Sequence, residues 1–220
     1  MKKYIILITL FTALTASAAY KRYFEDPKWP NDKSIHAQSI VNPAAAGTTN
    51  VLSANAGNTA STAVSVTSFV AQPDVPRNLV ITPGSTTADV ADCTVVVTGT
   101  DILGGEAVEG FGFAANASGA TTGSKAFKTI TSIVFPAGCE DSPYEATWSV
   151  GYGEKLGVDR CMDNAGDILF SLLNGSKEAT APTMAANVST VELNTADFNG
   201  TMNGSSDFVL YNFHNYRCNP

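Results

Sequence analysis

Residues 77–101 read RNLVITPGSTTADVADCTVVVTGTD, and this stretch decides the fold class. Asn78–Thr82 and Cys93–Gly99 are rich in β-branched and other apolar residues, a composition that favours strands. Between them, Pro83 and Gly84 begin a run of small polar residues that is typical of a turn. Nothing in the segment resembles a catalytic motif, so the stretch predicts strands and turns without the usual reactive groups.

The same combination of strand and turn recurs at short intervals along the chain. Turn sequences such as ANASGATTGSK and NGTMNGSS separate the candidate strands. Within Lys125–Phe135, strict alternation places Phe127, Ile133 and Phe135 on one face, as in a half-buried strand. We therefore predict an all-β fold, an antiparallel β-sandwich or jelly-roll-like barrel with an extended N-terminal arm. The candidate strands are Asn78–Thr82, Cys93–Thr100, Ala107–Ala114, Ala126–Phe135, Thr147–Gly151, Asp167–Leu173, Ser189–Asn194 and Asp207–Phe213.

The N-terminus has the order of a secretory signal peptide. Residues 1–3 (MKK) are basic, residues 4–16 are apolar, and residues 17–19 (SAA) are small, as at a cleavage site. We expect cleavage after Ala18 or Ala19. The alternative is a retained apolar helix that acts as a membrane anchor or packs on a partner.

Three segments follow from this pattern: residues 1–19 are signal-like, residues 20–62 form an extended arm and a low-complexity linker, and residues 63–220 form the β-sandwich domain. A first strand is expected near Ala63–Val70, and a short turn at Lys155–Met162. The large apolar side chains of the arm need cover from their own domain or from a neighbouring subunit. The second alternative is our interface prediction, and its residues are Tyr20, Tyr23, Phe24, Trp29 and Ile35.

The chain has four cysteines, and no C-x-x-C spacing supports a zinc or thioredoxin-like motif. If the protein is exported, two disulfides are expected. Neighbouring positions in a sheet favour Cys93 with Cys139 and Cys161 with Cys218. The alternative is four reduced thiols, which is the better prediction if the protein assembles in the cytoplasm.

Charge and composition narrow the range of functions. The net charge is −7 and no Lys/Arg cluster lies in the body of the chain, which argues against direct binding to nucleic acid. The acidic groups near residues 99–106, 139–141 and 159–163 are typical of turns and solvated loops. His36 and His214 have no evident nucleophile nearby, and there is no G-x-S-x-G motif. We predict no catalytic, cofactor-binding or metal-binding residues and no enzymatic activity.

Residues 73–204 resemble virion structural proteins of tailed bacteriophages. The resemblance rests on PDVPRNLVITPG, on FGFAANASGATTGSKAFKTITSIVFP, on WSVGYGEKLGV and on later segments. Its most specific part is GSKAF at residues 123–127 followed by TSIVFP at residues 131–136. The resemblance implies a non-enzymatic β protein of the head or tail, with no catalytic residues to transfer.

This resemblance implies a capsid decoration (cement) subunit, or a tail component, located in the virion. Its partners would be other virion subunits, such as the major capsid or tail protein, and further copies of itself; a membrane would be contacted only through a retained N-terminal segment. The alternative is a secreted bacterial surface protein, an adhesin or filament subunit with disulfides, which the leader and the even number of cysteines favour. An enzyme ranks third.

Overall fold

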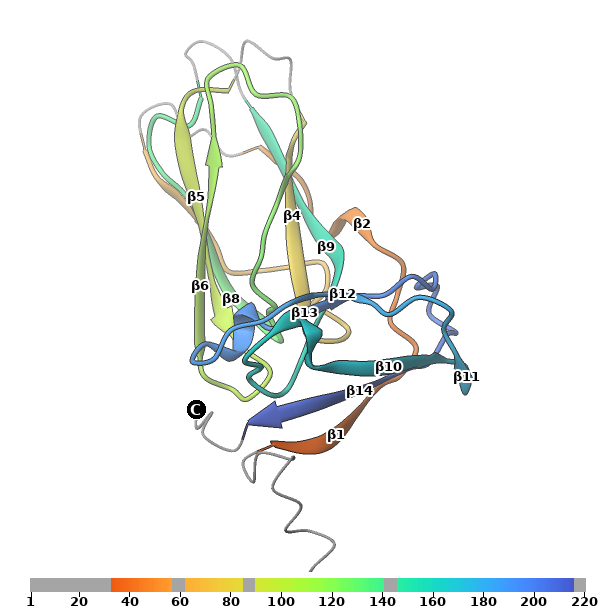
Figure 1. Cartoon of the computed structure of the whole chain (residues 1–220). Coiled ribbons are helices and arrows are strands. Elements are labelled where there is room, and N and C mark those ends of the chain that lie inside the picture. Colours follow the sequence, from red (N-terminus) through yellow and green to blue (C-terminus); the bar gives the residue numbers. More distant parts are fainter. Residues whose placement is uncertain (1–32, 57–61, 85–89, 141–145, 216–220) are drawn as a thin grey trace, which may run out of the picture. The chain divides into compact units, whose positions relative to one another are not determined.

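The computed structural model describes residues 33–56, 62–84, 90–140 and 146–215 (Figure 1). The chain divides into two compact units, Met1–Ser34 and Ile35–Pro220, and the account below concerns the second. Its fold is all-β with antiparallel sheets, as predicted. Among the described residues, no helix is long and apolar enough to cross a membrane.

The described residues form three sheets. Sheet A has the order β1 (Lys33–Ile40), β14 (Phe208–Asn215), β10 (Ile168–Leu173), β11 (Ser176–Lys177). Sheet B has the order β12 (Thr183–Ala185), β13 (Thr195–Asp197), β9 (Thr147–Gly157), β4 (Arg77–Pro83), β7 (Thr121–Thr122), with β2 (Gly47–Ala56) also on β9. Sheet C has the order β3 (Val64–Val66), β8 (Thr129–Phe135), β5 (Cys93–Thr100), β6 (Glu106–Phe113). Two short 3-10 helices are η2 (Ala165–Asp167) and η3 (Val191–Leu193).

Sheets B and C bury one shared core, which we call the sandwich core. Strands β4 and β9 supply residues to it from sheet B, and β5, β6 and β8 supply residues from sheet C. The Cys93–Cys139 disulfide lies at this core and confirms the predicted pairing. The main members are Leu79, Ile81, Trp148, Val150, Val95, Val97, Phe111, Ile133 and Phe135.

A second, smaller core lies between sheet A and the C-terminal part of β9. Its members come from β1, β9, β13, β14 and the loops around them, and we call it the second core. Strand β9 serves both cores, because Trp148 and Val150 belong to the sandwich core whereas Leu156 belongs to the second. The members of the second core are Ile40, Leu156, Val158, Met162, Ala196, Phe198, Met202, Phe208 and Leu210.

The alternation predicted for β8 is present but is interrupted once. The pairing of β8 with β5 shifts register between Thr98 and Gly99, so that Thr131 is an extra residue in a β-bulge. Ile130 is therefore buried, although strict alternation puts it on the opposite face. The residues predicted to share the core face are fully buried: Phe127, Ile133 and Phe135.

The segment predicted as a linker differs most from the structure. Strand β2 pairs with β9, and its Val51 and Leu52 belong to the sandwich core. The two strands approach closely at Gly151, where a Cβ atom would overlap the carbonyl group of Gly47. The described β structure therefore begins with β1, ahead of the predicted domain boundary at residue 63.

Two local predictions were wrong. The turn predicted at Lys155–Met162 begins too early, since β9 continues to Gly157. Ser189–Asn194 does not form a strand; the chain makes η3, and the strand β13 begins only at Thr195. The reason is the fully buried amide of Asn194, which accepts hydrogen bonds from Met162 N and Asn187 N and donates to carbonyl groups of the same loop.

Candidate functional site

Only part of the predicted interface falls within the described residues. Ile35 lies on β1 with 58% of its surface exposed. The other interface residues lie outside the described ranges, namely Tyr20, Tyr23, Phe24 and Trp29. Cys161 is disulfide-bonded, while its predicted partner Cys218 lies outside the described residues, so that pairing stays a prediction.

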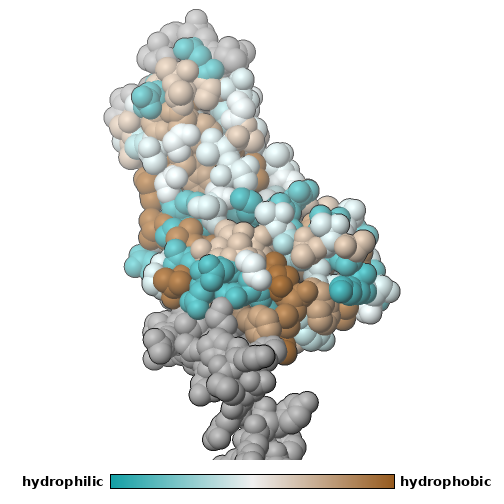
Figure 2. Space-filling view, in the orientation of Figure 1, coloured by the Kyte–Doolittle hydropathy of each residue, from teal (hydrophilic) through white to brown (hydrophobic). Residues whose placement is uncertain are grey.

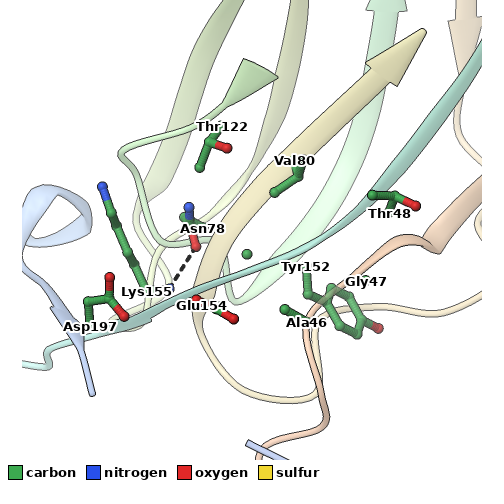
Figure 3. A pocket seen from close by; sticks show the side chains of 11 residues that line it. Ala46, Gly47, Thr48, Asn78, Val80, Thr122, Tyr152, Glu154, Lys155 and Asp197 are labelled. Carbon is green, nitrogen blue, oxygen red and sulfur yellow. Dashed lines mark hydrogen bonds between the residues drawn. The ribbon is translucent and has the colours of Figure 1, made fainter. Parts of the chain in front are cut away.

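A groove of about 410 Å³ lies over β4 and β9, lined also by β2, β7 and β13 residues (Figure 3). Asn78 lies in this groove, and its side-chain amide is hydrogen-bonded to backbone groups. Its Nδ2 donates to the Gly123 carbonyl (2.9 Å) and its Oδ1 accepts from Lys155 N (3.0 Å). Gly153 leaves room for this amide, because a Cβ there would overlap it. The amide thus holds two strands and a loop together.

Tyr152 lines the same groove, and its hydroxyl also binds the backbone. The hydroxyl donates to the Gln72 carbonyl at 2.5 Å. Burial raises the pKa of Tyr152 above its ordinary value of 10.0; Asp74 adds to this rise and Arg77 opposes it. A tyrosine with a raised pKa keeps its proton at neutral pH, so it serves here as a hydrogen-bond donor rather than as a base.

Arg77 is a fully buried cation at the junction of the two cores. Its guanidinium donates to the carbonyl groups of Gly153 and Ala44 and to Asp74 Oδ1 (3.1 Å). It lies over the Tyr152 ring, 5.1 Å from the centroid. These contacts satisfy a buried charge and link β4 to β9, which is a structural role.

A second cavity, of about 420 Å³, lies beside Cys161, and Asp101 and Asp159 from two of the three acidic groups noted in the sequence line it. Asp101 Oδ1 accepts from Leu103 N and Gly105 N, which shapes the hairpin turn between β5 and β6. Glu192 pairs with Lys125 (3.1 Å), and Asp159 lies 2.9 Å from the His36 ring nitrogen. Within the described ranges, no group of three or more His, Cys, Asp or Glu residues could hold a metal ion.

Sheet A carries a largely apolar face on the side away from the second core. In β14, Phe208 and Leu210 point into that core, so the alternate residues point outward. Phe170 and Tyr211 are paired across β10 and β14, and their rings stack with centroids 4.5 Å apart. Figure 2 shows hydrophobic residues gathered over this part of the molecule. We call this surface the outer face of sheet A; on β10 and β14 it comprises Phe170, Leu172, Val209, Tyr211 and Phe213.

Strand β1 extends this surface to the edge of sheet A. Gln38 points inward, since its Nε2 donates to the Gly157 carbonyl (2.8 Å) and its Oε1 accepts from Asp159 N. Ile40 also points inward and belongs to the second core. The alternate residues of β1 therefore lie on the outer face, and they are all exposed: Ile35, Ala37 and Ser39.

Sequence reasoning located Ile35 but missed the rest of this face. The signal was present in ILFSLL at residues 168–173 and FVLYNF at residues 208–213. Both runs are apolar at most successive positions instead of alternating, which is the pattern of strands that are covered on both faces. The two runs were predicted only as strands, and that prediction did not consider that half of their residues must point away from a single core.

Comparison with known proteins identifies no relative: no family model, no curated protein and no solved structure matches the chain. Function is therefore inferred from the site itself. Its two main features are the apolar outer face of sheet A, with β1 at its edge, and the disulfide-linked sandwich.

Proposed function

We propose that the chain is a non-enzymatic structural subunit of a virus particle, a capsid decoration (cement) protein or a tail component that acts through contacts between subunits. The observation that carries the proposal is the outer face of sheet A, which presents aromatic and aliphatic side chains on β10 and β14 and the exposed Ile35 on β1. The resemblance to phage virion proteins expected from residues 73–204 points to the same class of function, although no family model and no curated protein matches the chain.

The physical reason is the free energy of apolar surface in water. Covering such surface is favourable by about 25 cal/mol per Å², so an apolar sheet face favours a neighbour that covers it. In a symmetric particle each copy repeats the same contact, and many weak contacts together hold the subunit firmly. Trp29 of the arm lies only four positions before Lys33, the first residue of β1. Because they are so close in sequence, the arm and β1 are expected to bind the same neighbour.

The disulfides favour a second candidate, a secreted bacterial surface protein such as an adhesin or filament subunit. Cys93 is bonded to Cys139, and Cys161 is also disulfide-bonded. Disulfides persist in oxidising surroundings, which include the bacterial periplasm and the surface of a released virion. In a virus particle they would form after release from the host, whereas in a secreted protein they would form during export.

Mass spectrometry of purified particles tests the virion assignment. Particles from lysed cultures and the envelope fraction of intact cells are analysed in parallel, with thiols blocked by an alkylating reagent before lysis. We expect to find the protein in the particles. Cys93 and Cys139 should be alkylated in the protein taken from cells before lysis, and they should be bonded to each other in the protein of released particles. Recovery only from the envelope of uninfected cells, already oxidised, would contradict the virion proposal and support the secreted surface protein.

A further inference from the structure

The groove over β4 and β9 lies where the pairing of β9 with two of its neighbours is interrupted. The pairing with β4 shifts register between Arg77 and Leu79, and the pairing with β2 shifts between Gly47 and Leu52. Bulges of this kind re-aim side chains and are frequent beside functional sites. Residues from both interruptions line the groove, so its shape is a product of the two bulges.

The bulge in β9 brings two charged residues that are adjacent in sequence to the same groove. Between the paired positions, β4 has only Asn78, whereas β9 has three residues, and these are Gly153, Glu154 and Lys155. In a regular strand, Glu154 and Lys155 would point to opposite faces, yet both line this groove. Asp197 of β13, which is directly opposite Lys155, also lines it. One cation and two carboxylates therefore share one surface.

The polar head groups of these side chains are not used to hold the fold. Lys155 and Asp197 are directly opposite each other, but they form no ion pair in the part of the chain that the structure describes. The side chains of Thr48, Thr122 and Glu154 likewise make no hydrogen bond or ion pair among the described residues. Figure 3 shows Lys155 and Asp197 side by side at one end of the groove and Thr48 at the other. These groups are therefore available to a ligand.

The mixture of charges in the groove determines the class of ligand. Two carboxylates beside one ammonium group oppose the binding of phosphate and other anions. An apolar molecule would leave the charged groups without hydrogen-bond partners. A hydroxyl group both donates and accepts hydrogen bonds, so a molecule with several hydroxyl groups can satisfy carboxylates, an ammonium group and threonine hydroxyls together. The volume of about 410 Å³ lies in the range of small-molecule sites.

We propose that this groove binds a neutral saccharide, a mono- or disaccharide unit. Glu154 and Asp197 accept hydrogen bonds from the sugar hydroxyls, and Lys155 donates to them, while the half-buried Val80 supplies apolar contact to the ring. Many copies in one particle or filament would multiply weak single-site binding. The groove belongs to sheet B and not to the outer face of sheet A, so the inference does not depend on which of the two candidate functions is right.

The experiment is a titration of the full chain, produced with its disulfides and followed by amide NMR. The probes are glucose, galactose, mannose, rhamnose and N-acetylglucosamine, each added in steps to about 50 mM, with inorganic phosphate and glycine as charged comparison probes. We expect at least one sugar to shift the amide signals of residues 46–48 and 153–155 in a saturable way, with a Kd of roughly 1–10 mM. Phosphate and glycine should bind more weakly than that sugar.

Matched variants test whether the free head groups make the contacts. Lys155→Met and Asp197→Asn should each weaken sugar binding about tenfold, because each removes hydrogen bonds to a charged group. Thr122→Val changes an exposed residue and should weaken binding less, at little risk to the fold. The controls Lys128→Met and Glu106→Gln change exposed residues outside the groove and should bind as the wild type does. The melting temperature shows whether each variant folds.

Three results would each overturn the inference. The first is the absence of a saturable shift at the groove with every one of the five sugars. The second is tighter binding of phosphate or glycine than of any sugar, which would assign the groove to a charged ligand. The third is folded groove variants that bind the sugar as tightly as the two controls do.

Discussion

The sandwich core and sheet A differ in how their apolar residues are distributed over the two faces of a strand. In β5 of the sandwich, Val95 and Val97 are fully buried, while the opposite face is mostly polar, with three threonines and a single apolar residue: Thr94, Val96, Thr98 and Thr100. In β14 of sheet A, Phe208 and Leu210 are buried, yet the intervening Val209 is apolar as well. The sandwich completes its core within the chain, whereas sheet A has apolar side chains on both faces. On our proposal, the first region supplies stability and the second supplies the contact with a neighbouring subunit.

The two regions are joined rather than independent. Arg77 donates to Gly153 on β9, lies over Tyr152 of the sandwich core, and contacts Met202 of the second core. Strand β9 itself contributes to both cores. A loss of packing in the sandwich is therefore expected to destabilise the second core too, and the comparison can be tested by variants placed in each region.

The largest effect is expected from Trp148→Ala in the sandwich core. Trp148 is fully buried, and its ring lies 5.0 Å from the Phe113 ring and 5.5 Å from the Phe135 ring. Removing it leaves a large cavity, which should lower the free energy of unfolding by about 3–5 kcal/mol. Denaturant titration followed by circular dichroism measures the loss.

Trp148→Phe is the matched control for this variant. It keeps most of the ring volume and removes the indole N–H, which has no hydrogen-bond partner in the described part of the chain. We expect less than half of the alanine effect. An equal loss from both substitutions would mean that cavity formation is not the cause.

The next effect concerns the Cys93–Cys139 disulfide of the sandwich core. It is the one disulfide for which both cysteines lie within the described residues. Cys93 and Cys139 are separated by 46 positions, and a bridge that closes such a loop stabilises a domain by about 2–4 kcal/mol. The double variant Cys93→Ala/Cys139→Ala should lose this amount in a denaturant titration without reductant. If reductant lowers the stability of the wild type by less than the double variant loses, lost packing at the buried Cys139 accounts for the remainder.

A smaller effect on stability is expected on the outer face of sheet A. Phe170→Thr/Tyr211→Thr removes the stacked pair and keeps residues that favour strands, so the free energy of unfolding should fall by only about 1 kcal/mol. The inward Leu210→Ala, on the same strand as Tyr211, should cost about 2–5 kcal/mol. Binding of the dye ANS should fall in the outer-face variant. Equal destabilisation by both variants would show that the outer face is core, and would remove the contrast between the regions.

The fold class could be predicted from the sequence because its signals are local. Alternation and turn residues located β4, β5, β6, β8, β10 and β14, and the neighbouring-strand argument identified the Cys93–Cys139 pair. Strand β2 was missed because its burial depends on a close approach to Gly151, a contact distant in sequence. The bulge at Thr131 was missed for the same reason, since it depends on pairing with β5.

Of the outer face of sheet A, only Ile35 was singled out from the sequence. Strands β10 and β14 have apolar residues on both faces. The sequence alone does not show which of the two faces packs into a core and which points outward. Once Leu210 and Phe208 are placed in the second core, the outward direction of Tyr211 follows from alternation. The position of β1 at the end of the strand order of sheet A likewise is not encoded by any local pattern.

A last effect, similar in size to that of the outer-face variant, is expected at Tyr152, where the sandwich core meets Arg77. Tyr152→Phe removes the hydrogen bond to the Gln72 carbonyl and should cost about 1 kcal/mol at neutral pH. The raised pKa of Tyr152 in the folded protein adds a pH dependence. Above the ordinary tyrosine pKa of 10.0, the unfolded chain loses this proton while the folded protein retains it, so the stabilisation is complete below pH 10 and decreases as the pH rises further. Denaturant titrations between neutral pH and pH 11 should therefore show a steeper fall for the wild type than for Tyr152→Phe, so that the two curves converge. Parallel curves would show that Tyr152 has the same pKa in both states, and that its hydroxyl contributes only the hydrogen bond.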